Sequence, residues 1–184
     1  MKENMLVTGG CRSGKSRFAL AYANKHFRNK VFLATAKAFD DEMEKRISAH
    51  KEARGPEWTT IEEPTELAKV VTSLETDYDI VLIDCMTLWL SNLLMGGEDE
   101  SEIFSRVDAF IETIQKVPQS ILMVSNEVGY GIVPENKIAR QFRDIMGTVN
   151  QRLAAGSDVV VWTVAGIPQI IKGKPRQGIE AFGR

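Results

Sequence analysis

Gly9 to Ser16 read Gly-Gly-Cys-Arg-Ser-Gly-Lys-Ser, which fits the Walker A pattern Gly-x4-Gly-Lys-Ser/Thr. The apolar residues Met5 to Val7 precede this run, and a helix-compatible segment, Arg17 to Ala21, follows it. In such a strand-to-helix turn, glycines let successive backbone N–H groups surround phosphate oxygens, and the positive end of the new helix points at them. A glycine-rich turn that binds nothing is the alternative, but the strand, the spacing and the helix together favour a phosphate loop.

Two side chains of this loop and one further acid indicate a nucleotide site. Lys15 is expected to reach the β- and γ-phosphates, and the Ser16 hydroxyl to ligate Mg2+. Asp79 to Asp84 are an apolar strand candidate that ends in an acid. Beside a phosphate loop this is the Walker B arrangement, in which Asp84 orients Mg2+ directly or through water. The two motifs predict binding of a nucleoside triphosphate with Mg2+, and leave its use open.

Strand-like and helix-like segments alternate along the chain, which predicts one α/β domain over residues 1–184. Short runs rich in Val, Ile and Leu are typical of strands that are covered on both faces. The strand candidates are Met5–Thr8, Val31–Thr35, Asp79–Asp84, Ser120–Val124 and Asp158–Val164. The expected fold is that of a RecA-like P-loop NTPase, a mostly parallel sheet with helices on both faces.

Helix signals lie between these strand candidates. Pro64 to Glu66 resemble a helix start, and the acidic stretch Gly96 to Ser101 resembles a surface loop that leads into another helix. Glu135 to Ala154 predict a long helix that ends near Gly156. The glycine-containing tail, residues 173–184, is expected to be loosely held.

Composition and charge exclude several classes of protein. The chain has 184 residues, of which 43% are hydrophobic and 26% charged, as in an ordinary globular domain. A net charge of −2 offers no overall basic field for nucleic acid. The apolar stretches are shorter than the roughly 18 residues of a membrane-spanning helix. Cys11 and Cys85, without a nearby metal-ligand partner, fit reduced thiols in the cytoplasm.

The segment from Asp40 to Arg54 contains no glycine or proline and predicts a helix. Glu42, Arg46, His50 and Arg54 recur every four residues, so they share one helical face. A solvated stripe with a Glu42–Arg46 ion pair is one interpretation. The other is chemical, because an imidazole is largely neutral at pH 7 and has a ring nitrogen free to attack phosphorus. The cations that can neutralise phosphate charge around His50 are Arg46, Lys51 and Arg54.

Short, distinctive sequence motifs occur in order along nearly the whole chain. They are Leu6–Ser16, Ala34–Thr35, Asp41–Met43 and Arg46–Ile47 before His50, then Trp58, Glu62, Asp84–Trp89, Asn92–Leu94, Ser125–Gly129, Gly131–Pro134, Phe142–Asp144 and Asn150–Gln151. In these motifs the chain resembles the bifunctional adenosylcobinamide kinase / adenosylcobinamide-phosphate guanylyltransferases of cobalamin biosynthesis. It departs from them at Cys11, a position often taken by alanine.

The resemblance implies two reactions. A γ-phosphate moves from ATP or GTP to the aminopropanol hydroxyl of adenosylcobinamide, and GMP then moves from GTP to that phosphate, giving adenosylcobinamide-GDP and pyrophosphate. The histidine that carries the guanylyl group falls on His50, and Lys15 joins it as a catalytic residue. The implied nucleotide contacts are Gly9, Gly10, Cys11, Arg12, Ser13, Gly14, Lys15, Ser16, Ala34, Thr35, Ala36, Lys51, Glu52, Ala53, Arg54, Glu62 and Asp84. The family also implies a homo-oligomer, with a trimer favoured.

Some features leave alternatives open. The stretch from Ser125 to Pro134 is either a structural turn or a ligand-binding loop, in which Asn126 and Glu127 face the substrate or a neighbouring subunit. A plain P-loop kinase of a small alcohol would need the two nucleotide motifs but no reactive histidine. A RecA-like ATPase that binds nucleic acid would need a basic, aromatic-bearing surface.

Overall fold

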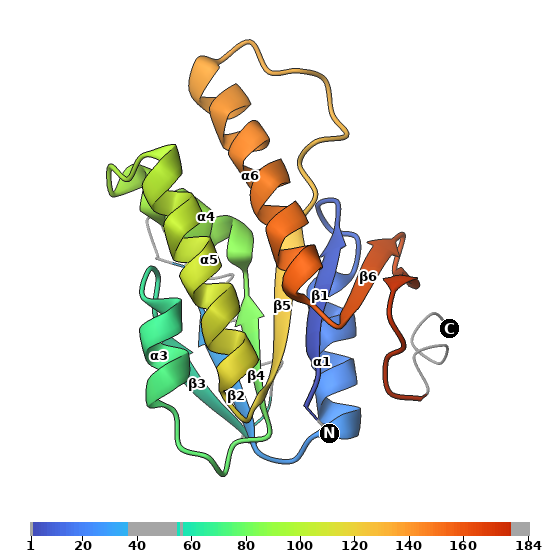
Figure 1. Ribbon diagram of the computed structural model, residues 1–184. Helices are drawn as coiled ribbons and strands as arrows, with labels where there is room; N and C mark the ends of the chain where they lie inside the picture. Colours follow the sequence, from blue (N-terminus) through green and yellow to red (C-terminus); the bar gives the residue numbers. More distant parts are fainter. Residues whose placement is uncertain (1, 37–54, 56, 178–184) are drawn as a thin grey trace.

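The computed structural model describes residues 2–36, 55 and 57–177, and their strands form one seven-stranded sheet (Figure 1). In spatial order the strands are β3 (Trp58–Glu62), β2 (Lys30–Ala34), β4 (Ile80–Asp84), β5 (Ser120–Asn126), β1 (Asn4–Gly9), β6 (Val159–Val164) and β7 (Ile167–Lys172). Neighbouring strands run parallel, except that β7 returns antiparallel to β6. The expected α/β fold with a mostly parallel sheet is confirmed.

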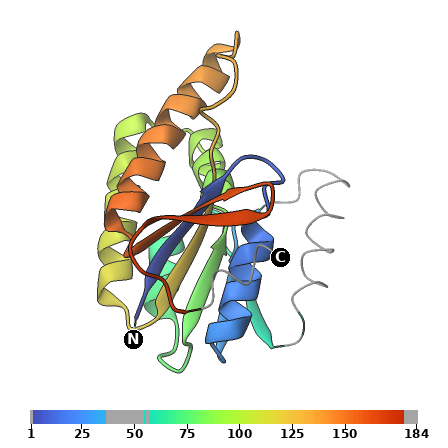
Figure 2. The same ribbon diagram turned by 90° about the vertical axis from the view of Figure 1, so that its right-hand side faces the viewer.

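Helices cover both faces of this sheet, as predicted (Figures 1 and 2). The helix that follows the phosphate loop, α1 (Lys15–His26), lies on one face. The other face carries α3 (Leu67–Ser73), α4 (Met86–Met95), α5 (Glu100–Lys116) and α6 (Lys137–Gly156). Side chains alternate along a strand, and so Leu6 of β1 packs in the core under α3 to α6, whereas Met5 and Val7 pack in the core under α1.

Capping side chains set where two helices begin. Asp99 accepts hydrogen bonds from the N–H groups of Ser101 and Glu102, so α5 begins inside the stretch that was expected to be loop. Asn136 accepts from the N–H groups of Ile138 and Ala139. This cap starts α6 at Lys137, two residues later than predicted.

The order of the strands brings the nucleotide motifs to one edge of the sheet. β5 lies between β1, which leads into the phosphate loop, and β4, which ends at Asp84. In the register of the sheet, Gly9 lies beside Asn126, and Asp84 lies beside Val124. Open α/β sheets bind ligands at this carboxyl edge. In the described part of the chain, no helix has both the length and the apolar character that crossing a membrane requires.

Candidate active site

The phosphate loop connects the end of β1 at Gly9 to the start of α1 at Lys15. Three of its residues have a positive φ: 152° at Gly9, 53° at Arg12 and 97° at Gly14. Gly14 caps α1 in the left-handed conformation, and its carbonyl accepts the first helical hydrogen bond, from the N–H of Phe18 at 2.9 Å. The loop therefore curls back on itself at the N-terminus of a helix, as phosphate binding requires.

The β6–β7 hairpin supports this loop from one side. Ala165 and Gly166 both have a positive φ and form the two-residue turn between the strands. The N–H of Gly166 donates to the carbonyl of Ser13 at 2.9 Å, and the hydroxyls of Ser13 and Thr163 are 2.8 Å apart. A Cβ added at Gly14 would lie 3.1 Å from the Cα of Gly166. Glycine at position 14 therefore allows close approach of the hairpin as well as the turn itself.

Lys15 lies almost buried within the loop, and 7% of its surface is exposed. Its Nζ donates a hydrogen bond of 2.7 Å to the carbonyl oxygen of Gly10. Burial lowers the pKa of Lys15, while the nearby Cys85, Asp84 and Cys11 act in the opposite direction. Phosphate oxygens in the loop would favour the charged form of this desolvated ammonium.

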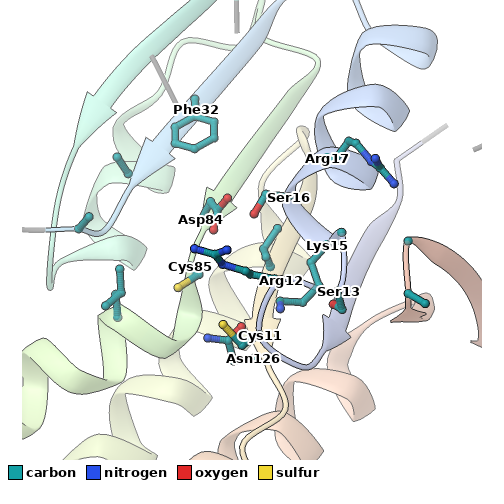
Figure 3. Close-up of a pocket in the computed structure, with 17 residues that line it drawn as sticks. Cys11, Arg12, Ser13, Lys15, Ser16, Arg17, Phe32, Asp84, Cys85 and Asn126 are labelled. Carbon is teal, nitrogen blue, oxygen red and sulfur yellow. The ribbon is translucent and has the colours of Figure 1, made fainter. Parts of the chain in front are cut away.

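A cavity of about 700 Å³ opens in front of the loop (Figure 3). The loop residues Cys11 to Ser16 line it, together with Ala34, Ala36 and Asp84, all of which were predicted to contact nucleotide. Figure 3 shows the Asp84 carboxylate and the Ser16 hydroxyl directed toward the same part of this cavity. A carboxylate and a hydroxyl are hard oxygen ligands, which Mg2+ prefers, and a triphosphate would supply further oxygens.

The Thr35 side chain connects the end of β2 to the end of β4 by hydrogen bonds. It is fully buried, and its hydroxyl donates to the carbonyl of Cys85 and accepts from the N–H of Cys85, both at 2.7 Å. The Asn92 side chain donates to the carbonyls of Thr35 and Pro64. These bonds fix the end of β2 beside β4, so that Ala34 and Ala36 line the cavity. The nucleotide contact at Thr35 stays a prediction, and its hydroxyl has this structural role.

Other sequence-predicted residues lie elsewhere or outside the described residues. Glu62 ends the edge strand β3 and pairs in register with Ala34, but the described lining of the cavity does not include it. His50 and its neighbours Lys51, Glu52, Ala53 and Arg54 fall among residues 37–54, which lie outside the described part of the chain. Their roles stay predictions.

Further residues line the cavity that the nucleotide-binding motifs did not predict. These lining residues are Arg17, Phe32, Cys85, Leu88, Val124, Ala165 and Gly166. Burial, followed by the nearby Asp84 charge, raises the pKa of Cys85 to about 11, so its thiol stays protonated at neutral pH. Asn126 lines the cavity too, which favours the ligand-binding interpretation of the start of its loop. The signal that locates it is its place at the end of an apolar strand.

Comparison with known proteins identifies relatives over the full extent of the site. Residues 5–171 match the family described as cobinamide kinase / cobinamide phosphate guanyltransferase. The chain is 42% identical over 180 residues to the bifunctional adenosylcobalamin biosynthesis protein CobU of Salmonella typhimurium, covering 91% of this chain and 99% of that protein. It is 39% identical over 170 residues to the bifunctional protein CobP of Pseudomonas aeruginosa, covering 92% and 98%.

Solved structures show the same fold at low sequence identity. The RadB recombinase matches with a TM-score of 0.51 and 14% identity, over 87% of this chain and 73% of that one. An ATPase of a bacterial type III secretion system matches with a TM-score of 0.56 and 12% identity, over 87% of this chain and 50% of that one. These likenesses show that the chain shares its α/β fold with these proteins.

Proposed function

The chain belongs to the cobinamide kinase / cobinamide phosphate guanyltransferase family, and on that premise we propose how its residues carry the two reactions. The family expected from the sequence motifs is confirmed. The protein is a bifunctional transferase of cobalamin biosynthesis that phosphorylates adenosylcobinamide and then transfers GMP from GTP to the product. The plain small-molecule kinase and the nucleic-acid ATPase do not match this family.

The observation that carries the proposed mechanism is the shared cavity of Lys15, Ser16 and Asp84 at the phosphate loop. In the kinase step, the loop N–H groups bind phosphate oxygens, and Lys15 neutralises charge on the β- and γ-phosphates. Ser16 and Asp84 would hold Mg2+. When bound, that ion neutralises charge that develops on the phosphates during transfer. Alignment and charge neutralisation supply most of such catalysis, because the transition state is loose.

For the guanylyl step, the proposed nucleophile is the imidazole of His50. Nδ1 or Nε2 forms a bond to the α-phosphorus of GTP, the bond from that phosphorus to the α–β bridging oxygen breaks, and pyrophosphate leaves with the electron pair. The cobinamide phosphate then attacks the same phosphorus, and the imidazole leaves. Lys15 stabilises the departing pyrophosphate, with Arg54 as a second cation. The support for His50 is the sequence pattern and the family resemblance.

Incubation with α-32P-GTP and Mg2+, followed by a denaturing gel, tests this step. The wild-type chain is expected to carry label that acid removes, as for a phosphoramidate. His50→Ala should lose the label and guanylyl transfer but keep kinase activity, whereas Lys15→Ala should weaken both reactions. A labelled His50→Ala protein would remove His50 from this role. Full activity of Lys15→Ala in either reaction would show that this reaction does not use the phosphate loop.

A homo-oligomer, with a trimer favoured, and a cytoplasmic location complete the proposal. Large apolar side chains are exposed on the β5–α6 loop and at the start of α6, where self-association would cover them. They are Tyr130, Ile132, Val133 and Ile138. Cys11 and Cys85 are free thiols, as a reducing compartment favours. Light scattering after size exclusion tests the assembly, because a monomer has a mass of 20.5 kDa.

A further inference from the structure

Asn126 ends β5 at the carboxyl edge of the sheet, between the two nucleotide motifs. β5 is hydrogen-bonded to β1 on one side and to β4 on the other, so Asn126 lies beside Gly9 and one strand away from Asp84. It lines the same cavity as Cys11, Lys15 and Asp84 (Figure 3).

The backbone around Asn126 is fixed by side chains from two helices. Its N–H donates to the Thr87 hydroxyl of α4 at 2.8 Å, and its carbonyl accepts from the Asn150 Nδ2 of α6 at 3.1 Å. The next N–H, of Glu127, donates to the carbonyl of Gly9 at 2.9 Å and ties this strand end to the phosphate loop. Position 126 is therefore held firmly against the loop by bonds that do not involve its own side chain.

The Asn126 carboxamide itself makes no hydrogen bond to another described residue. A carboxamide offers two N–H donors and a carbonyl acceptor. A polar group on a rigid backbone that faces a phosphate cavity is ready to bind ligand, and it needs no reorganisation when charge develops nearby. Because it lines the same cavity as Lys15 and Asp84, which are expected to serve the terminal phosphates, a terminal phosphate is the ligand that its carboxamide would bind.

We propose that Asn126 is a catalytic residue of the kinase step, and that its Nδ2 donates a hydrogen bond to an oxygen of the γ-phosphoryl group. This inference rests on the proposed function. In the step, the acceptor hydroxyl oxygen forms a bond to the γ-phosphorus, and the bond from that phosphorus to the β–γ bridging oxygen breaks. The electron pair leaves with the nucleoside diphosphate, and the hydroxyl proton passes to water. The neutral carboxamide stabilises the equatorial oxygens throughout.

Steady-state kinase assays of Asn126→Ala and Asn126→Asp test this role. Loss of one preorganised donor to a developing anion lowers kcat by a factor of about 100 or more. We expect that loss in Asn126→Ala, with a much smaller change in the KM for nucleotide. Asn126→Asp keeps the shape but places a carboxylate beside the phosphoryl oxygens and Asp84, so its kcat should be lower still. Both variants should unfold within about 2 °C of wild type, because the fixing bonds use the backbone.

Asn136→Ala is the matched control, because it makes the same chemical change at the N-cap of α6. It should lower the melting temperature and leave kcat unchanged. Full kinase activity in Asn126→Ala would overturn the inference, and so would higher activity in Asn126→Asp than in Asn126→Ala. A third such result is a melting temperature of Asn126→Ala so low that unfolding under the assay conditions explains its lost activity. A wild-type chain without kinase activity would instead contradict the proposed function.

Discussion

At the scale of single residues, Gly9 determines how closely the phosphate loop can approach its supporting strand. Its φ of 152° is unfavourable for any residue with a side chain. A Cβ at this position would clash with the carbonyl oxygen of Thr163 and lie 2.7 Å from the Ser13 hydroxyl. Its neighbour Gly10 has open space around the same point, with nothing within 4 Å. Close packing against Thr163 and Ser13 therefore requires glycine at position 9, whereas packing leaves room for a side chain at position 10.

Gly9→Ala is therefore expected to lower the free energy of unfolding by about 2 kcal/mol or more, from backbone strain and overpacking together. It should also weaken Mg2+-GTP binding, because the loop must shift away from Thr163. Urea unfolding and nucleotide titration measure the two effects. Gly10→Ala is the control and should unfold like wild type. Equal stability of the two variants would contradict the clash at Gly9.

At the scale of elements, the β6–β7 hairpin connects sheet and site. The Thr163 hydroxyl is paired with the buried Ser13 hydroxyl and also donates to the carbonyl of Thr8 at 3.3 Å. Thr163→Val keeps the shape of the side chain but leaves the Ser13 hydroxyl without this partner. The expected cost is about 1–2 kcal/mol of unfolding free energy, with weaker nucleotide binding.

Thermal unfolding and nucleotide titration of Thr163→Val measure that cost. The same substitution at Thr60, which is exposed on the edge strand β3, serves as the control and should change neither quantity. If Thr163→Val binds nucleotide as tightly as wild type, the hairpin supports the fold but does not organise the loop.

The elements that could be predicted from sequence are the central ones. Strands β1, β2, β4, β5 and β6 are covered by helices and consist of apolar runs, which is the pattern that identified them. The edge strands β3 and β7 were not predicted. β3 buries mainly Trp58, and β7 contains Pro168 and is mostly exposed, so neither has a buried apolar run. Pairing with a neighbour, rather than their own pattern, makes them strands.

The same distinction applies to the candidate site. Lys15, Ser16 and Asp84 belong to local motifs, and their shared cavity follows from the strand order that such motifs imply. Ala165 and Gly166 line it only because a hairpin 150 residues later in the chain packs on Ser13. Asn126 joins it through the register of β5 with β1. The hairpin contact arises from tertiary packing and leaves no local signal, whereas the place of Asn126 at the end of an apolar strand is a local signal.

At the scale of the whole molecule, the cavity lies where strand ends, the phosphate loop and the hairpin meet, so ligand binding should stabilise the entire fold. A ligand at about 100 times its Kd adds about 2.7 kcal/mol to the free energy of unfolding. For a domain of this size, that corresponds to a rise in melting temperature of about 5–11 °C. We expect Mg2+-GTP to give a shift of this order.

Chelation and a lysine variant identify the source of that stabilisation. GTP with EDTA should give a much smaller shift than Mg2+-GTP, because Asp84 then faces the triphosphate without a cation between them. Lys15→Met should abolish the shift, since it removes the ammonium that meets the β- and γ-phosphates while retaining a long side chain in the loop. If the melting temperature rises equally with and without Mg2+, Ser16 and Asp84 do not hold Mg2+ on the bound nucleotide. A full shift in Lys15→Met would place the triphosphate outside the phosphate loop.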